Sequence, residues 1–423
     1  MEARELLLGS FRAALSVADP LQVVPRELPK PPRGRTLVVG AGKAAGAMAL
    51  AVERSWPAEA PLEGVVITRY GHGLPVSRIR VVEAGHPVPD DKGEAAAREI
   101  LAAARALGPE DLLLALVSGG GSSLLALPVP GVPMADLKAL TKALLASGAP
   151  IQDMNTVRKH LSAIQGGRLA AATRAQVVSL VISDVTGDDP THIASGPCAP
   201  DPSTFAEAIE VCARYGVEPP ASIAAHLARG ARGEEAETPK PGDPAFARVE
   251  NRVIATAHAS LDAAAAFVAK HGVAPLILGD SVTGEAREVA KAYAALAREV
   301  RGHAQPVGPP AALISGGETT VTVRGKGRGG RCTEFLLSLA VGLAGSKGTW
   351  ALACDTDGID GSEDNAGAIL TPDALARAAA LGLEAKAMLA ENDGYGFFSA
   401  LGDLVVTGPT RTNVNDYRII LVA

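Results

Sequence analysis

The sequence predicts an α/β protein with two domains, and three observations predict this fold class. An apolar strand over residues 36–39 passes through a glycine turn into an alanine-rich helix, as in open α/β sheets. Apolar strands then alternate with amphipathic helices in both halves of the chain. Residues 229–248 are rich in Gly, Pro and charge and have few large apolar side chains, which predicts the domain boundary there.

Length and composition exclude several classes of protein. The 423 residues are too many for one ordinary core. Aromatic residues make up only 3% and the net charge is −6, which argues against a nucleic-acid partner. We see no signal peptide and no apolar run of membrane-spanning length, so we expect a cytoplasmic protein with a small-molecule substrate and no membrane partner. The four cysteines lack metal-site spacing and are expected to be free thiols: Cys198, Cys212, Cys332 and Cys354.

The elements expected in the first half follow from apolar spacing and from Gly and Pro stops. A helix is expected over 4–18, followed by an irregular Pro-rich segment over 21–35. The other expected helices end near Glu53 or cover 136–146 and 155–172, and the expected strands are 36–39, 64–68, 110–117 and 176–183.

Lys43 lies at the mouth of the first glycine turn, residues 40–46. A strand, a glycine turn and a helix place backbone N–H groups and a helix N-terminus against a phosphate. The turn departs from the NAD fingerprint, because Ala45 replaces the third glycine and the next strand ends at Arg69 instead of an acidic residue. It also departs from a Walker A loop, which requires Ser or Thr where Ala44 stands. An ordinary surface lysine is the alternative.

A second glycine loop follows the strand over 110–117 and places three glycines between hydroxyl residues. Such a loop is a candidate anion site, with a flexible connection as the alternative. Asn155 and Arg158, near the start of the expected helix over 155–172, could reach a cleft, although a solvated face explains basic residues there equally well. Three aspartates follow the strand over 176–183 and suit Mg²⁺ or a proton acceptor, unless they only form a turn.

The second half contains a comparable set of motifs. Expected strands begin at 252–257 and 275–279 and continue at 311–314, 350–354, 404–407 and 417–422. In the stretch 313–334 a Ser-Gly-Gly turn precedes alternating β-branched residues, then four glycines interleaved with Arg and Lys, and then a helix. The glycines, the basic side chains and the helix N-terminus suit a phosphorylated ligand. A solvated basic hairpin is the alternative.

Each half therefore offers a glycine loop and carboxylates at strand ends. Asp355 and Asp357 follow the strand over 350–354, and a Thr/Asn/Asp loop precedes the last strand. Ligands of open α/β sheets bind outside the carboxyl ends of the strands. We therefore expect a cleft between two domains that gathers basic, acidic and N–H groups.

These motifs together resemble the bacterial-type glycerate 2-kinases with a C-terminal MOFRL domain. The resemblance covers nearly the whole chain, in order, through the segments 39–44, 118–122, 154–158, 183–197, 315–318, 356–361 and 407–410. It implies a Rossmann-like N-terminal domain (1–235), a smaller α/β MOFRL domain (249–423) and an active site in the cleft between them. It also implies ATP- and Mg²⁺-dependent phosphorylation of D-glycerate to 2-phosphoglycerate.

The resemblance and the motifs together define the expected site residues. The catalytic candidates are Lys43, Arg331 and the possible base Asp189. Metal ligands are expected among Asp184, Asp188, Asp355 and Asp357. The residues expected to bind substrate or ATP are Gly42, Ser118, Gly119, Gly120, Gly121, Ser122, Asn155, Arg158, Ser195, Gly196, Ser315, Gly316, Gly317, Glu318 and Asn413.

Lys43 and Arg331 lie on expected turns, so their replacement is predicted to leave the fold intact. Three positions depart from the family pattern: Cys332 and Thr333 stand where Asn and Gln are usual, Gly396 where a larger residue is common, and Arg411 where glycine is usual. Two other functions remain as alternatives. An NAD(P)H-dependent hydroxypyruvate reductase would use the first glycine turn, and a non-catalytic sugar-acid binding protein would use the cleft alone.

Overall fold

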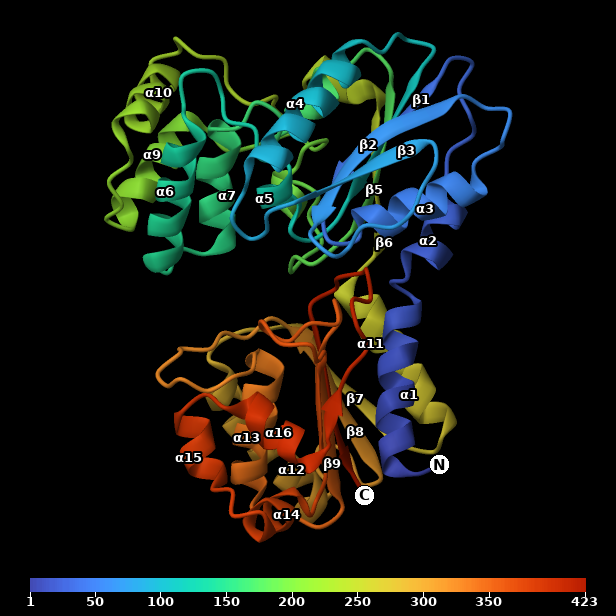
Figure 1. The fold of residues 1–423 in the computed structure, drawn as a ribbon, viewed down its shortest axis with the longest axis vertical. Helices are drawn as coiled ribbons and strands as arrows, with labels where there is room; N and C mark the ends of the chain where they lie inside the picture. The colour runs from blue at the N-terminus through green and yellow to red at the C-terminus, as the bar shows by residue number, and fades with distance from the viewer. The chain divides into compact units, whose positions relative to one another are not determined.

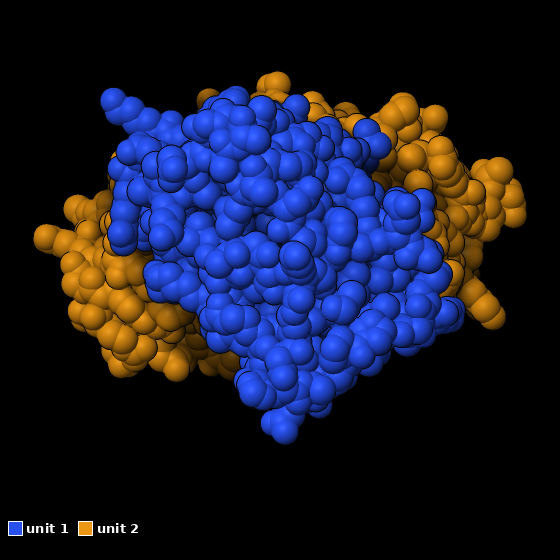
Figure 2. Space-filling view, turned by 90° about the horizontal axis from the view of Figure 1, so that it is seen from below, with its two compact units in different colours: residues 1–19, 255–423 blue, residues 20–254 orange.

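The computed structural model describes residues 1–423, and they form two compact units. Unit 1 comprises residues 1–19 and 255–423, and unit 2 comprises residues 20–254. Figure 2 colours the two units separately. Each unit contains one six-stranded sheet with helices packed on it, so the predicted α/β class is confirmed. No helix is both long enough and apolar enough to cross a membrane.

The sheet of unit 2 has the strand order β3-β2-β1-β4-β5-β6, and the pairs among β1 to β5 are parallel (Figure 1). Its strands are β1 (Thr36–Ala41), β2 (Leu62–Arg69), β3 (Ile79–Ala84), β4 (Leu112–Val117), β5 (Gln176–Ile182) and β6 (Val249–Ala255). From β1 the chain adds β2 and β3 on one side, and it then returns to add β4, β5 and β6 on the other side, so the strand order reverses between β1 and β4. In open parallel sheets, ligands bind at the carboxyl ends of the strands beside such a reversal.

The helices of unit 2 divide into those beside the sheet and a separate helical group. Those earlier in the chain are α2 (Pro20–Glu27), α3 (Ala45–Ser55), α4 (Asp91–Arg105) and α5 (Gly121–Leu124). The later ones are α6 (Met134–Ala146), α7 (Ile151–His160), α8 (Arg168–Ala171), α9 (Phe205–Arg214) and α10 (Ala221–Ala231), with 3₁₀ turns η1 (Ile193–Ser195) and η2 (Pro244–Arg248).

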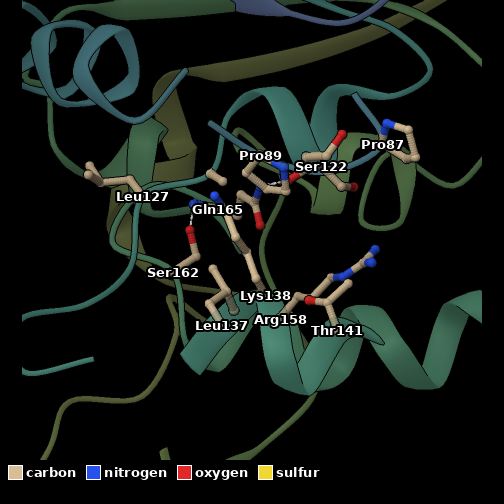
Figure 3. A pocket seen from close by; sticks show the side chains of 12 residues that line it. Pro87, Pro89, Ser122, Leu127, Leu137, Lys138, Thr141, Arg158, Ser162 and Gln165 are labelled. Atoms are coloured by element: carbon tan, nitrogen blue, oxygen red, sulfur yellow. Dashed lines mark hydrogen bonds between the residues drawn. The ribbon is translucent and has the colours of Figure 1, made fainter. Parts of the chain in front are cut away.

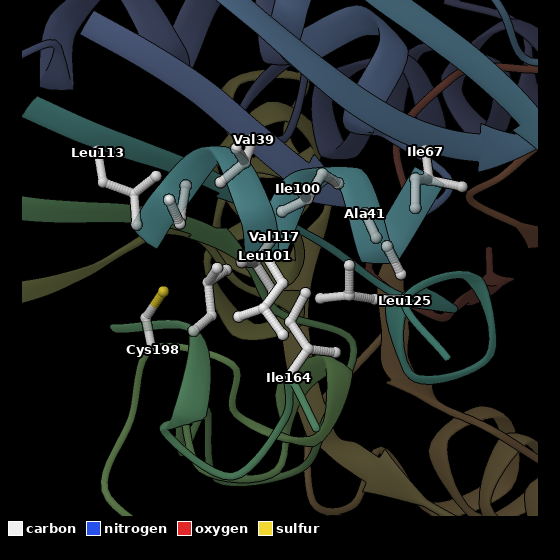
Figure 4. Packing of buried hydrophobic residues seen from close by; sticks show 14 of the residues in the cluster. Val39, Ala41, Ile67, Ile100, Leu101, Leu113, Val117, Leu125, Ile164 and Cys198 are labelled. Atoms are coloured by element: carbon white, nitrogen blue, oxygen red, sulfur yellow. The ribbon is translucent and has the colours of Figure 1, made fainter. Parts of the chain in front are cut away.

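Two apolar clusters stabilise unit 2. In the first, Ile100 and Leu101 of α4 pack against Val39 of β1 and Val117 of β4 (Figure 4). Burying such side chains contributes roughly 1.5–3 kcal/mol each relative to leaving them exposed. The second cluster joins α6, α7, α9 and α10 around Phe205, which is fully buried. The strand ends that carry the candidate site residues are thus held by packed structure.

Unit 1 has a mixed sheet with the strand order β11-β10-β9-β12-β8-β7. Only β7 and β8 pair in parallel, and β12 is antiparallel to both β8 and β9. The strands are β7 (Ala274–Val282), β8 (Ala311–Gly317), β9 (Thr349–Asp355), β10 (Gly367–Leu370), β11 (Leu404–Val405) and β12 (Asp416–Val422). The carboxyl ends of β8 and β9 and the start of β12 therefore meet at one edge of the sheet.

Helices cover both faces of the unit 1 sheet. Successive residues of a strand point to opposite faces, so Leu313 packs with α12 and α13, whereas Ile314 packs with α1 and α11. The helices are α1 (Ala3–Ser16), α11 (Ala257–Lys270), α12 (Ala286–His303), α13 (Arg331–Leu343), α14 (Ala374–Ala380), α15 (Ala385–Ala390) and α16 (Gly394–Leu401).

The division into units differs from the predicted domains at both ends of unit 2. Helix α1 packs with unit 1, where Phe11 stacks on Tyr417 with ring centroids 5.8 Å apart. The hydroxyl of Tyr417 also lies 3.0 Å from that of Ser10. At the other end, β6 joins the sheet of unit 2 instead of opening the second series of strands. Neither the packing of α1 on unit 1 nor the pairing of β6 in unit 2 could be predicted, because the partners are distant in the sequence.

Two expected elements were wrong. The expected helix over 155–172 is broken into α7 and α8, because Gly166 (φ +59°) and Gly167 (φ +80°) turn the chain. Residues 20–27 form helix α2 within the segment expected to be irregular. The alternating residues 319–323 form no extended strand, only an isolated bridge between Thr320 and Glu285.

Candidate active site

The Lys43 turn and the Ser118 loop of unit 2 pack directly together at the carboxyl ends of β1 and β4. The backbone N–H of Lys43 donates to the carbonyl of Gly119 at 2.8 Å, and the N–H of Ala44 donates to Ser118 Oγ at 3.1 Å. A side chain at Gly42 could not fit, because its Cβ would lie 2.1 Å from Ser118 Oγ at a φ of +143°. Glycine is therefore required for this close approach.

The Ser118 loop presents two backbone donors that bond to nothing in the protein. No protein atom accepts a hydrogen bond from the N–H groups of Gly119 and Gly120. Gly120 has a φ of +80°, and the Lys43 stem passes beside it, with Cγ 3.5 Å from the position of a Cβ. Backbone N–H groups in a turn beside a lysine form an anion-binding concavity. Gly121 instead begins α5, and a Cβ on it would lie 2.8 Å from the Ala41 carbonyl oxygen, so this glycine allows the close packing of the loop.

Ser122, Ser195 and Asn155 form a continuous hydrogen-bonded chain. Asn155 Nδ2 donates to the His192 carbonyl at 3.2 Å, and Ser195 Oγ donates to Asn155 Oδ1 at 3.1 Å. Ser122 Oγ lies 2.9 Å from Ser195 Oγ. This chain joins α5, η1 and α7, three elements that the sequence alone could not place together.

The backbone of η1 is strained where this chain is built. Ala194 and Ser195 have φ values of +51° and +58°, and Gly196 follows with +59°. Left-handed backbone at a non-glycine residue costs of order 1–3 kcal/mol and collects at functional sites. The carbonyls of Ser195 and Gly196 accept hydrogen bonds from Gly166 and Gly167, which holds the strained turn in place.

The predicted acidic residues after β5 do not converge on one point. Asp189 Oδ1 accepts a hydrogen bond from the Thr191 N–H at 2.8 Å. Burial raises the pKa of Asp189, but the hydrogen bonds from Thr191 outweigh burial and leave the pKa below its usual range. Asp188 lies in a left-handed turn with φ +55°, and Asp184 follows directly after β5. No group of three or more His, Cys, Asp or Glu side chains in the chain could hold a metal ion.

Arg158 lines a pocket within unit 2 that also reaches Ser122 (Figure 3). The guanidinium of Arg158 forms no ion pair and no hydrogen bond with the protein, and burial lowers its pKa. The pocket encloses about 420 Å³, part of it open solvent. It is lined by Pro87, Pro89, Ser122, Ser123, Ala126, Leu127, Leu137, Lys138, Thr141, Arg158, Ser162 and Gln165.

Arg331 is surrounded by three carboxylates at one edge of the unit 1 sheet. Its guanidinium donates to Asp416 at 2.7 Å and to Asp355 at 2.8 Å, and it pairs with Glu318 at 2.9 Å. Asp355 and Asp416 face each other in the register of β9 and β12, which places both carboxylates beside one arginine. Burial lowers the pKa of Arg331, but the carboxylates outweigh burial and hold its pKa above the usual range.

Asp416 and Gly316 are also tied to a second buried arginine. Arg418 pairs with Asp416 through one nitrogen and donates to the Gly316 carbonyl at 3.0 Å through another. The charge of Arg331 is thus compensated within the protein. Glu318 is its most exposed partner, with 56% of the side chain accessible, against 5% for Asp355 and none for Asp416.

The N-terminus of α13 is occupied by a side chain of the protein. Asp360 accepts hydrogen bonds from the N–H groups of Cys332 and Thr333, both at 2.9 Å, and from the Thr333 hydroxyl at 2.8 Å. Burial raises the pKa of Asp360 despite these three bonds. The sequence reading assigned this helix end to a phosphorylated ligand. The N–H groups of Cys332 and Thr333 do not serve such a ligand, because an internal carboxylate already binds them.

Asp360→Ala is expected to lower the free energy of unfolding by about 1–3 kcal/mol, because it leaves buried donors without an acceptor. Urea unfolding followed by circular dichroism measures this change. The matched control is Asp364→Ala, which removes an exposed aspartate that accepts a hydrogen bond from the Tyr395 hydroxyl. Equal stability of the Asp360 and Asp364 variants would contradict the capping role.

The glycines over 325–330 also allow this segment to pack closely against residues 391–393. The carbonyl oxygen of the Asn392 side chain accepts hydrogen bonds from the N–H groups of Arg324 and Gly325, at 2.7 and 3.1 Å. A Cβ on Gly325 or Gly327 would lie 2.3 or 2.5 Å from residues 391 and 393. The glycines therefore allow close approach of two backbones, and the predicted phosphate cradle is not formed by these N–H groups.

The other predicted residues of unit 1 lie close to this edge. Ser315 Oγ is buried and has no hydrogen-bond partner, and Gly317 (φ +101°) contacts the Val282 backbone. Asp357 Oδ1 accepts from the Ile359 N–H at 2.9 Å, whereas Asn413 Oδ1 accepts from the Asn415 N–H at 3.4 Å. A groove within unit 1 borders Arg331 and is lined by Thr319, Val321, Val323, Gly327, Gly329, Gly330, Arg331, Glu334, Gly361 and Asn392.

The structure shows the local backbone or packing at two of the positions that depart from the family pattern, Arg411 and Gly396. Arg411 has a φ of +62°, a left-handed conformation that glycine adopts without strain. At Gly396, a Cβ would lie 2.3 Å from Asp393 Oδ2, so Asp393 would have to move to admit a larger residue. Cys332 is fully buried, and burial raises its pKa.

Sequence reasoning missed several residues that organise these sites. Asp416 and Asp360 hold Arg331 and the start of α13, and Gln165 donates to the Ser122 carbonyl at 2.8 Å. The one available signal was the position of Asp416 at the end of the polar loop before the last strand. The partners lie more than 20 residues away from one another, so local motifs could not identify them.

Two family models match this chain. The family model described as "Domain of unknown function (DUF4147)" matches residues 6–228, and the model described as "MOFRL family" matches residues 311–416. A protein of Agrobacterium vitis with the provisional name hydroxypyruvate reductase is 53% identical, over 100% of this chain and 95% of its own length.

Two relatives carry kinase names. A D-glycerate 2-kinase of Thermotoga maritima is 39% identical, over 99% of this chain and 98% of its own. A glycerate 2-kinase of Pyrococcus horikoshii is 37% identical, over 100% of this chain and 98% of its own. The crystal structure of the Thermotoga maritima glycerate kinase superposes with a TM-score of 0.88 at 39% identity, covering 99% of both chains.

Proposed function

Because this chain belongs to the glycerate kinase family with a C-terminal MOFRL domain, we propose that it transfers the γ-phosphoryl group of ATP to the 2-hydroxyl of D-glycerate. The product would be 2-phosphoglycerate. The observation that carries the proposal is the Lys43 stem beside the unbonded N–H groups of Gly119 and Gly120. Phosphoryl transfer requires mainly positioning and neutralisation of charge, which such a cluster supplies.

In this proposal the residues at the carboxyl ends of β1 and β4 bind phosphate. The two N–H groups donate to phosphate oxygens, and the Lys43 ammonium neutralises charge that moves during transfer. The backbone bonds of Lys43 to Gly119 hold the turn in position before the ligand arrives. Donors that need no reorganisation stabilise a transition state more than mobile donors do.

Mg²⁺ is proposed as the second cofactor. It is usually held by one or two carboxylates together with substrate phosphates and water, so it needs no cage of three acidic residues. Asp184 and Asp188 follow β5, the neighbour of β4, and are the proposed ligands in unit 2. In unit 1, Asp355 and Asp357 are the proposed ligands, although Asp355 already pairs with Arg331. The bound ion would neutralise charge on the phosphates.

Asp189 is the proposed acceptor of the substrate hydroxyl proton. Its Oδ1 is directed to the Thr191 N–H, and its lowered pKa keeps it ionised near neutral pH. Arg331 borders the groove of unit 1 and could exchange its exposed partner Glu318 for an anion of the substrate. This exchange keeps the buried partners Asp355 and Asp416 in place and requires no new buried charge.

The test is an assay of the purified protein with D-glycerate, ATP and Mg²⁺, with the product position read by ³¹P NMR. We expect ADP release only when glycerate and the divalent cation are both present. The alternative reductase is favoured by the name of the Agrobacterium vitis relative. Oxidation of NADH or NADPH with hydroxypyruvate, without ATP turnover, would overturn the kinase proposal.

A further inference from the structure

The pocket around Arg158 contains positive charge that the protein does not compensate. Arg158 and Lys138 both line it, and neither forms an ion pair. Arg168, which also has a lowered pKa from burial, differs in having the nearby carboxylates Asp201 and Glu237 and a hydrogen bond to the Lys159 carbonyl at 2.7 Å. Even partial burial of a charged group without a partner is costly, so the half-buried Arg158 suits an anion from outside.

The hydrogen-bonded chain beside the pocket has a defined direction. Asn155 uses its NH₂ group for the His192 carbonyl, so its Oδ1 accepts the single hydroxyl proton of Ser195. Ser195 Oγ can then only accept from Ser122, at 2.9 Å. Ser122 therefore donates its hydroxyl hydrogen to Ser195, and the Ser122 oxygen can still accept a hydrogen bond. A ligand hydroxyl in the pocket can therefore donate to Ser122 Oγ.

We infer that this pocket is the hydroxy-acid subsite of the enzyme, with Arg158 binding the substrate carboxylate and Ser122 accepting a hydrogen bond from a hydroxyl of the same molecule. The inference rests on the proposed function and assigns the carboxylate to Arg158 instead of Arg331. Arg331 already has three carboxylate partners, whereas Arg158 has none. A guanidinium also matches a carboxylate through two parallel N–H bonds.

The walls of the pocket define the class of ligand further. Leu127, Leu137 and Ala126 supply apolar surface, and Pro87 and Pro89 supply rigid edges (Figure 3). The space of about 420 Å³ includes open solvent, so the pocket is a shallow site and not a closed cavity. Within the pocket, Gln165 is already committed through its NH₂ group to the carbonyls of Ser122 and Leu125. It holds the loop instead of selecting the ligand.

The test measures binding by calorimetry in the presence of a non-hydrolysable ATP analogue and Mg²⁺. Three ligands separate the contacts: D-glycerate, its uncharged amide glyceramide, and propionate, which has the carboxylate but no hydroxyl. Arg158→Gln should weaken D-glycerate and propionate about 10- to 100-fold, as for loss of a charged hydrogen bond, and leave glyceramide unchanged. Ser122→Ala should weaken D-glycerate and glyceramide about 5-fold and leave propionate unchanged.

Two controls keep the test independent of folding and of general charge. Lys142→Gln removes an exposed cation of α6 that does not line the pocket, and it should bind all three ligands as the wild type does. Arg158→Gln should melt at the wild-type temperature or above it, because it removes a buried charge that has no partner. Arg158→Lys retains charge and should recover part of the affinity for D-glycerate.

The outcomes distinguish this inference from the proposed reaction. Unchanged affinity of Arg158→Gln for D-glycerate would overturn the subsite, even if the wild type phosphorylates glycerate. A raised KM for ATP with an unchanged KM for glycerate would make the pocket a phosphate site and also overturn it. The wild type could also bind glycerate without phosphorylating it. If Arg158→Gln then loses D-glycerate binding, the result would support the subsite and reject the kinase.

Discussion

Arg331→Ala is expected to lower the free energy of unfolding by about 3 kcal/mol or more, because it removes the cation shared by two buried carboxylates. Asp355 and Asp416 face each other across β9 and β12, and both accept hydrogen bonds from this guanidinium. The sequence predicted that the fold would tolerate this change, since the residue follows a glycine turn. The structure reverses that expectation. Guanidinium chloride unfolding measures the loss.

The control for this prediction is Arg328→Ala in the same segment. Arg328 pairs with Glu363 at 3.4 Å, and 60% of its side chain is exposed, so its removal should cost at most about 1 kcal/mol. Adding Asp355→Asn to the Arg331→Ala protein should restore part of the stability, because it removes one of two facing negative charges. Equal stability of Arg331→Ala and Arg328→Ala would show that the three-carboxylate cluster is not structural.

Lys43→Ala is expected to reduce kcat about 100-fold or more, as for loss of one preorganised contact to developing charge. The fold should not change, because the backbone hydrogen bonds of Lys43 to Gly119 and of Ala44 to Ser118 remain in this variant. Lys43→Arg should recover little activity, since a planar guanidinium does not replace a compact ammonium beside Gly120. Steady-state kinetics with ATP and D-glycerate, with melting temperatures, measure these effects.

Lys30→Ala serves as the comparison for Lys43→Ala. Lys30 is exposed on the segment between α2 and β1 and forms no ion pair, so its removal should leave kcat unchanged. If Lys43→Ala retains near wild-type kcat while its melting temperature is unchanged, Lys43 is a surface lysine and has no part in the reaction.

Much of the fold and part of the candidate site could be predicted because they depend on short, local patterns. An apolar run followed by glycine identified β1 and the Lys43 turn, and the same pattern identified β4 and the Ser118 loop. Strand ends and left-handed turns impose local steric demands that only a few residue types meet. The same local rules could not detect that α7 ends at His160 and that Gly166 and Gly167 turn the chain before α8, because isolated glycines are also tolerated in helices.

The sequence by itself determined the α/β class, the glycine turns and the carboxylates at the strand ends. Only the tertiary structure decided which of these groups remain available to a ligand. It places Asp360 on the start of α13, three carboxylates on Arg331, and no partner on Arg158. Charged groups are neutralised by whatever packs against them, and these partners come from strands and loops distant in the sequence. Periodicity and local motifs predict the geometry of a helix, strand or turn. They do not identify which residues pack against it in the folded protein.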